Sequence, residues 1–188
     1  MQARYKQFVC LPLSTIGRKT ADGLRVAGAG RAAYNPGSTR SDIIKGAGMP
    51  RMQLTRKVRF SAAHRYHRPE WSDEQNREAF GPCANPHGHG HDYLLEVTVE
   101  GEVHPVTGFS VDLGRLDAVL RDEVIVPFDH QHLNHVVPEF APGGLIPTSE
   151  NILLLISRRL APRLHDVSVV RLRLHENPDF YVDYAPGA

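Results

Sequence analysis

The stretch that decides the fold is Cys83–Asp92, CANPHGHGHD, where one cysteine is followed by histidines at every second position. Side chains two residues apart leave the same face of an extended strand, so His89 and His91 can present two imidazoles to one metal ion. Gly88 and Gly90 remove side-chain bulk where ligands would crowd the backbone. Imidazole nitrogen suits Zn²⁺, and catalytic zinc sites usually combine three protein ligands with one open position.

A third imidazole is expected from Phe60–His64, FSAAH, which ends an alternating, strand-like stretch. His64 reaches the cluster if this stretch pairs antiparallel with the strand that starts at His91. His87 shares the alternation, but we rank it below His64 because it enters from a loop after Pro86. A histidine-rich patch can also be a solvated loop, so spacing alone leaves metal binding open.

Length and charge restrict the class of protein. The chain has 188 residues, which suits one domain. Residues 1–48 carry eight Lys/Arg and two Asp/Glu, and the remainder carries fourteen and nineteen. The mildly acidic body argues against a nucleic-acid partner, and no apolar run approaches membrane-spanning length. Two cysteines rule out a disulfide framework and favour a reducing compartment, for which we predict the cytoplasm.

Residues 1–50 are predicted to be a disordered basic leader, because they show no sustained helical or strand period. Their arginines and scarcity of acids resemble a transit peptide. A start-site misassignment before Met49 or Met52 explains the segment equally well. The folded domain is expected to span 54–188.

The body shows strand alternation first, then helical spacing, then strands again. Alternating residues predict strands over 54–64, 93–100, 168–176 and 180–184, and a loop over 66–82. Apolar spacing predicts one helix after Asp112 and a second after Thr148, each capped by the residue named. We therefore predict an α+β domain of ββααββ order, with a four-stranded antiparallel sheet backed by two helices.

Six segments in order resemble the 6-pyruvoyl-tetrahydropterin synthase family, which includes the 6-carboxytetrahydropterin synthases of the queuosine pathway. The resemblance covers about residues 54–184. The segments are FSAAH at 60–64, C-x5-HGH at 83–91, GFSVD at 108–112, DHQHLN at 129–134, PTSEN at 147–151, and the late Glu176.

The resemblance implies a fold and an assembly. The fold is the tunnelling fold, in which subunits form rings. The assembly is a homohexamer of two stacked trimers, with each active site between neighbouring subunits. The metal it implies is zinc, held by His64, His89 and His91.

The resemblance also implies the catalytic residues. Cys83 is the catalytic cysteine, and Asp129 with His130 completes a triad. Glu176 anchors the pterin ring, whose 2-amino and N3 hydrogens form a fork that a carboxylate can accept in a bidentate manner. Its pocket is lined by the segment that contains two further residues, Thr148 and Glu150.

The implied function is a zinc-dependent lyase acting on 7,8-dihydroneopterin triphosphate. Five residues between Cys83 and His89 favour the type that eliminates triphosphate and gives 6-pyruvoyl-tetrahydropterin. The alternative is a 6-carboxy-5,6,7,8-tetrahydropterin synthase, which uses the same pocket. A hypothesis of another class is a non-catalytic, zinc-stabilised interaction module, which would require a closed shell of four protein ligands.

Overall fold

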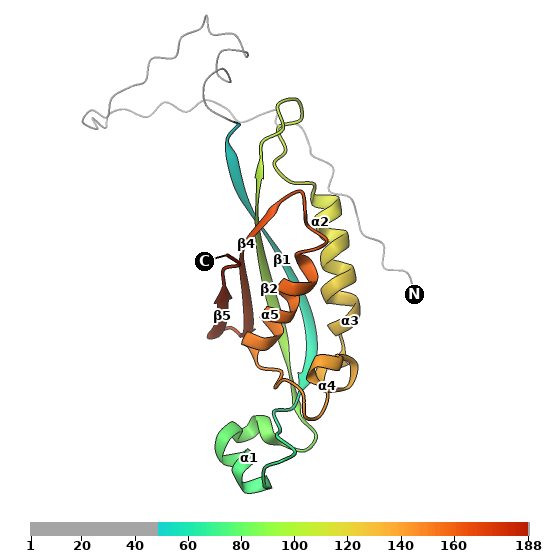
Figure 1. Cartoon of the computed structure of the whole chain (residues 1–188), viewed down its shortest axis with the longest axis vertical. Coiled ribbons are helices and arrows are strands. Elements are labelled where there is room, and N and C mark those ends of the chain that lie inside the picture. Colours follow the sequence, from blue (N-terminus) through green and yellow to red (C-terminus); the bar gives the residue numbers. More distant parts are fainter. Residues whose placement is uncertain (1–48, 188) are drawn as a thin grey trace, which may run out of the picture. The chain divides into compact units, whose positions relative to one another are not determined.

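The computed structural model describes residues 49–187, and four long strands dominate it (Figure 1). They are β1 (Arg51–His64), β2 (His89–Glu102), β4 (Ser168–Asn177) and β5 (Phe180–Tyr184), each antiparallel to its neighbour. All four were predicted from alternation. The second, β2, begins at His89, four residues before the alternating range 93–100 and two before His91. The predicted leader lies outside the described residues except for its last two positions.

A fifth strand, β3 (Gln131–His132), corrects the predicted sheet. It pairs parallel with β1 at Ala62 and Ala63, which gives a mixed sheet of order β3-β1-β2-β4-β5. The prediction of a four-stranded, purely antiparallel sheet in ββααββ order is therefore wrong in this detail, although the α+β class holds. A strand of two residues is too short to show a period and is fixed by contacts with β1 instead.

Two helical segments form where the sequence placed them. The first is α2 (Leu113–Leu120), which continues through one π-helical turn, η2 (Arg121–Ile125), into α3 (Val126–Phe128). The second is α5 (Ser149–Leu160). Asp112 and Thr148 act as N-caps, and their side chains accept hydrogen bonds from backbone N–H groups three residues on, at 3.0 and 3.3 Å.

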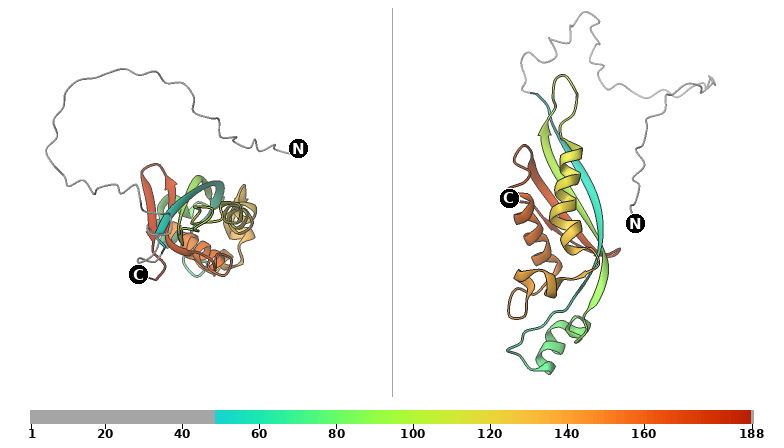
Figure 2. Two further views of the ribbon diagram at one scale, coloured as in Figure 1. Left: turned by 90° about the horizontal axis from the view of Figure 1, so that it is seen from above. Right: turned by 90° about the vertical axis from the view of Figure 1, so that its right-hand side faces the viewer.

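These helices cover one face of the sheet, and the core lies between the two layers (Figure 2). Apolar side chains of alternate strand positions meet the apolar stripes of the helices, as their periods require. No helix within 49–187 is both long and apolar enough to cross a membrane. Fully buried members of this core include Leu95, Val97, Leu120, Phe128, Ile152, Ile156 and Leu172.

The segment predicted as a loop over 66–82 contains a helix, α1 (Asp73–Phe80), followed by a 3₁₀ turn, η1 (Gly81–Ala84). Ser72 and Gln75 form a capping box at its start, in which each side chain bonds the other's backbone N–H. That pair was a readable helix signal which the prediction missed. Short helices α4 (Leu133–Val136) and η3 (Pro138–Phe140) complete the described elements.

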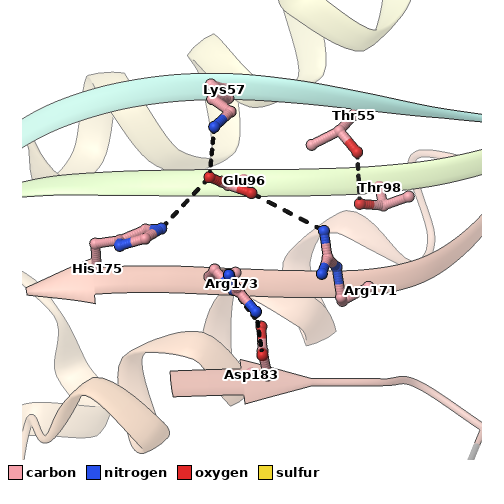
Figure 3. Close-up of polar contacts among 8 residues, drawn as sticks. All are labelled: Thr55, Lys57, Glu96, Thr98, Arg171, Arg173, His175 and Asp183. Carbon is pink, nitrogen blue, oxygen red and sulfur yellow. Dashed lines mark hydrogen bonds and ion pairs between the residues drawn. The ribbon is translucent and has the colours of Figure 1, made fainter. Parts of the chain in front are cut away.

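The opposite face of the sheet is polar (Figure 3). Glu96 on β2 has a side chain only 10% exposed, and it accepts a hydrogen bond from Lys57 Nζ at 2.6 Å. His175 Nε2 and Arg171 Nη2 approach the same carboxylate at 3.4 and 4.0 Å. Lys57 holds the pKa of Glu96 below its usual range, and this outweighs the effect of burial. The sheet thus has one apolar face and one charged face.

Candidate metal centre and active site

Three histidines converge at the end of the β1–β2 pair. In its register His64 lies opposite His89 and Ala62 opposite His91, so all three imidazoles project from the face that bears the helices. Their candidate ligand atoms lie within 4.8 Å of one another, and Nε2 of His64 is 3.2 Å from Nε2 of His89. The predicted antiparallel pairing is confirmed, and it is this pairing that supplies the third ring.

The three rings fit a divalent metal ion. Two nitrogens bound to a tetrahedral zinc at 2.0–2.1 Å would stand about 3.3 Å apart, close to the observed 3.2 Å. Nε2 of His91 is buried and forms no hydrogen bond among residues 49–187, although Oε1 of Glu176 lies 3.3 Å from it. A buried nitrogen without a partner is costly, and a cation bound at its lone pair would satisfy it.

Burial favours the neutral form of two of the three rings, His64 and His91. Burial, reinforced by the neighbouring His89 and His91, lowers the pKa of His64 to about 3. Burial also lowers the pKa of His91, although the charge of Glu176 opposes this. Neutral imidazole is the form that binds metal. His87 is exposed and stands outside the group.

Two glycines permit the close approach of β1 and β2. Gly88 has a φ of +69°, and a Cβ atom there would stand 2.4 Å from the backbone oxygen of His64. A Cβ atom on Gly90 would lie 3.1 Å from the oxygen of Ala62. Any larger residue at Gly88 would push His64 away from the other two rings, as the sequence suggested.

Cys83 lies next to the cluster. It sits in η1, and its carbonyl accepts a hydrogen bond from Tyr66 N at 2.8 Å, just beyond the end of β1. Its Sγ is 3.8 Å from Nε2 of His89. Burial, and then the charge of Glu176, raises the pKa of the thiol. The thiol is therefore protonated at neutral pH unless a cation offsets these two effects.

Glu176 lies on the other side of the rings. Its Oε1 is 3.3 Å from Nε2 of His91, and its Oε2 accepts a hydrogen bond from the hydroxyl of Ser149. Of the two predicted neighbours of Ser149, Thr148 caps α5 and Glu150 is exposed in its first turn. The structure links Glu176 to the histidines and joins neither Thr148 nor Glu150 to it by a hydrogen bond within the part of the chain described.

Ser149 was missed by the sequence analysis. It is 1% exposed and occupies the apolar stripe of α5 with Ile152, Leu153 and Ile156. A hydroxyl in an apolar helical stripe must find a partner, because an unpartnered buried polar group is costly. That argument would have singled out Ser149 from the sequence.

Asp129 and His130 form a pair of their own at the edge of β1. Asp129 accepts hydrogen bonds from Ser61 N at 2.8 Å and from His130 Nδ1 at 2.9 Å. His130 has a φ of +58°, and its side chain is 81% exposed. Across residues 49–187, no hydrogen bond or ion pair joins this pair to Cys83 or to the three histidines.

Comparisons with known proteins agree on one family. The model of the family described as 6-pyruvoyl tetrahydropterin synthase matches residues 53–187. A 6-pyruvoyl tetrahydrobiopterin synthase of Poecilia reticulata is 40% identical over 131 residues, which make up 70% of this chain and 88% of that protein. A relative from Pyrococcus furiosus, 34% identical over 128 residues (68% of this chain and 91% of its own), is named dihydroneopterin monophosphate aldolase.

A solved structure shows the same fold. The 6-pyruvoyl tetrahydropterin synthase of Caenorhabditis elegans superposes with a TM-score of 0.67 at 32% identity. The match covers 74% of this chain and 98% of the other. The matches therefore cover nearly the whole length of these relatives, and the family model matches this chain from residue 53 to residue 187.

Proposed function

The chain belongs to the 6-pyruvoyl tetrahydropterin synthase family, and from this premise we propose that it is a zinc-dependent lyase that converts 7,8-dihydroneopterin triphosphate to 6-pyruvoyl-tetrahydropterin and triphosphate. The observation that carries the proposal is the meeting of three imidazoles with one thiol and one half-buried carboxylate. The cytoplasm remains the predicted compartment.

His64, His89 and His91 would hold the zinc ion, because they supply three converging nitrogens. When bound, the ion would polarise the side-chain oxygens of the substrate as a Lewis acid. Catalytic zinc sites keep one position open for such oxygens. Burial lowers the pKa of His64 and of His91, so these two rings are ready to bind without losing protons.

Glu176 would orient the pterin ring. A carboxylate accepts the 2-amino and N3 hydrogens together, and the charge strengthens both bonds. The hydroxyl of Ser149 fixes the rotamer of Glu176 from the α5 side. Thr148 and Glu150 would contact the ring edge from the same turn of the helix. A ring held there would bring the three-carbon side chain of the substrate toward the histidines.

Cys83 would remove a proton from a side-chain carbon of the substrate. In the free protein its sulfur holds a proton, since burial and Glu176 raise its pKa. A dication beside His89 would reverse that balance and favour the thiolate. His130 would return or relay a proton, with Asp129 holding Nδ1–H so that Nε2 is free for exchange.

We propose that Asp129 and His130 act on the active site of a neighbouring subunit, within a hexamer of two stacked trimers. Support comes from the 81% exposure of the His130 side chain and from the absence, in residues 49–187, of any bond between this pair and its own Cys83. A dyad fixed firmly by Ser61 yet directed outward suits such an arrangement.

Mixing two inactive variants tests this arrangement. Neighbours that carry Cys83→Ala and His130→Ala should restore activity at interfaces where an intact cysteine meets an intact histidine. Random equal mixing of subunits, after dissociation and reassembly, should give about a quarter of wild-type turnover. A mixture as inactive as its components would show that the dyad acts within its own chain.

The reaction itself is tested by incubating zinc-loaded protein with 7,8-dihydroneopterin triphosphate. We expect stoichiometric triphosphate release and 6-pyruvoyl-tetrahydropterin by mass spectrometry. A 6-carboxyl product would support the alternative left open by the sequence, and loss of the side chain would support an aldolase, the activity named for the Pyrococcus furiosus relative. No turnover of any pterin, together with a closed four-ligand zinc shell, would support the interaction module.

A further inference from the structure

Tyr93 makes a contact that the proposed mechanism does not use. Its hydroxyl oxygen lies 3.0 Å from Nδ1 of His64, and both residues are 0% exposed. His64 directs its other nitrogen, Nε2, toward His89 at 3.2 Å. His64 is thus held at one nitrogen by Tyr93 while the other faces the cluster.

A neutral imidazole has one N–H and one lone pair, so its two nitrogens cannot both bind metal or both donate. A metal at Nε2 requires the lone pair there and the hydrogen on Nδ1. That hydrogen is buried and needs an acceptor. We propose, on the premise of the metal site proposed above, that Tyr93 is the positioning residue for His64. The hydroxyl oxygen of Tyr93 accepts the Nδ1 hydrogen of His64 and so leaves Nε2 of His64 free for the metal.

The surroundings of Tyr93 suit this role. It lies opposite Phe60 in the β1–β2 register, and the two rings stack with centroids 5.0 Å apart and planes 17° apart. The stacked, buried ring therefore holds its hydroxyl at a fixed place.

Tyr93→Phe removes the acceptor and keeps the stack on Phe60. Tyr66→Phe is the matched control, because the Tyr66 ring also packs on His64, at 4.7 Å between centroids. Among residues 49–187, the hydroxyl of Tyr66 makes no hydrogen bond to the ring of His64. Competition with a chelator measures the zinc affinity of each protein. We expect Tyr93→Phe to weaken zinc binding about 10–100-fold, as losses of ligand-orienting partners do, and Tyr66→Phe to leave it within about twofold.

Nitrogen-15 spectra of the histidine rings in the wild-type protein provide a readout that does not depend on whether a variant folds. In wild-type protein loaded with zinc, His64 should carry its hydrogen on Nδ1, and its resonance should shift in Tyr93→Phe. Unchanged affinity in Tyr93→Phe, or a hydrogen on Nε2 of His64 in the wild type, would overturn the inference. Wild-type protein that binds no zinc would instead overturn the proposed metal site and this role with it.

Discussion

Replacing Cys83 by alanine separates the enzyme from the structural zinc module. If the thiol is the base, the variant should keep its zinc and lose about 10²–10⁴-fold in turnover, the usual contribution of general base catalysis. If the thiol is the fourth ligand of a closed site, zinc affinity should fall with it. The two hypotheses therefore predict different zinc affinities for Cys83→Ala, and zinc affinity is measured without any substrate.

The distances explain why this experiment is needed. Sulfur and nitrogen bound to one tetrahedral zinc, at 2.3 and about 2.05 Å, would stand about 3.5 Å apart. Sγ of Cys83 is 3.8 Å from Nε2 of His89, so a small shift would complete a four-ligand shell. A structural zinc site is worth about 10–16 kcal/mol, so one of four ligands accounts for roughly 2.5–4 kcal/mol, or about 10²–10³-fold in Kd.

The assay is chelator competition for zinc, followed by steady-state turnover on the same samples. Cys10→Ala, which changes the other cysteine of the chain, controls for thiol chemistry in general. We expect Cys83→Ala to keep zinc affinity within about threefold of the wild type, a change of less than 1 kcal/mol. A loss of 100-fold or more in zinc affinity would refute the assignment of Cys83 as the base.

Three further predictions follow from the geometry. His89→Ala removes one of three converging nitrogens, so zinc affinity should fall roughly 10²–10³-fold and turnover should disappear; metal analysis that finds one zinc per chain would contradict the site. Glu176→Gln replaces a charged acceptor by a neutral one, so KM should rise about 10–100-fold, equivalent to the 1.5–3 kcal/mol of a charged hydrogen bond; an unchanged KM would mean that Glu176 does not bind the ring. Glu96→Gln should lower the free energy of unfolding by about 1–2 kcal/mol at pH 7 and the Tm by about 3–6 °C. The free-energy figure is reduced because the Lys57 side chain is 59% exposed and water screens the ion pair. Because the pKa of Glu96 is depressed in the folded protein, this stabilisation is present above the unfolded value near 4.5 and is lost as the pH falls through the folded value. The difference in Tm between wild type and variant should therefore narrow between pH 5 and pH 3, and an equal difference at both would show that the charge of Glu96 is not what stabilises this face.

Predictions from the sequence succeeded where a structural feature depends only on residues that are close together in the chain. The alternation of His89 and His91 places two rings on one face because a strand has a period of two. Asp112 and Thr148 were identified as caps because a short polar side chain before an apolar helical run bonds the free N–H groups of the first turn. Each rule acts within a few residues, so the sequence contains all the information it needs.

Predictions failed where the relevant contact spans distant segments. β3 has two residues, and it forms because Asp129 and His130 bond Ser61, nearly seventy positions earlier. Nothing in the local pattern around Gln131 indicates a strand. The helix α1 is a different case, since the Ser72–Gln75 capping box was readable and was overlooked.

The amino-acid sequence by itself determined the class of the fold, the family and the identity of the three metal-binding candidates, because periodicity, caps and ordered motifs are local properties of the chain. Only the tertiary structure decided the partners of those residues. It placed Ser149 against Glu176, Tyr93 against His64, and Asp129 against Ser61 and His130. The physical reason is that hydrogen-bond partners and burial depend on how β1, β2, β4 and α5 pack, which no short window of sequence contains.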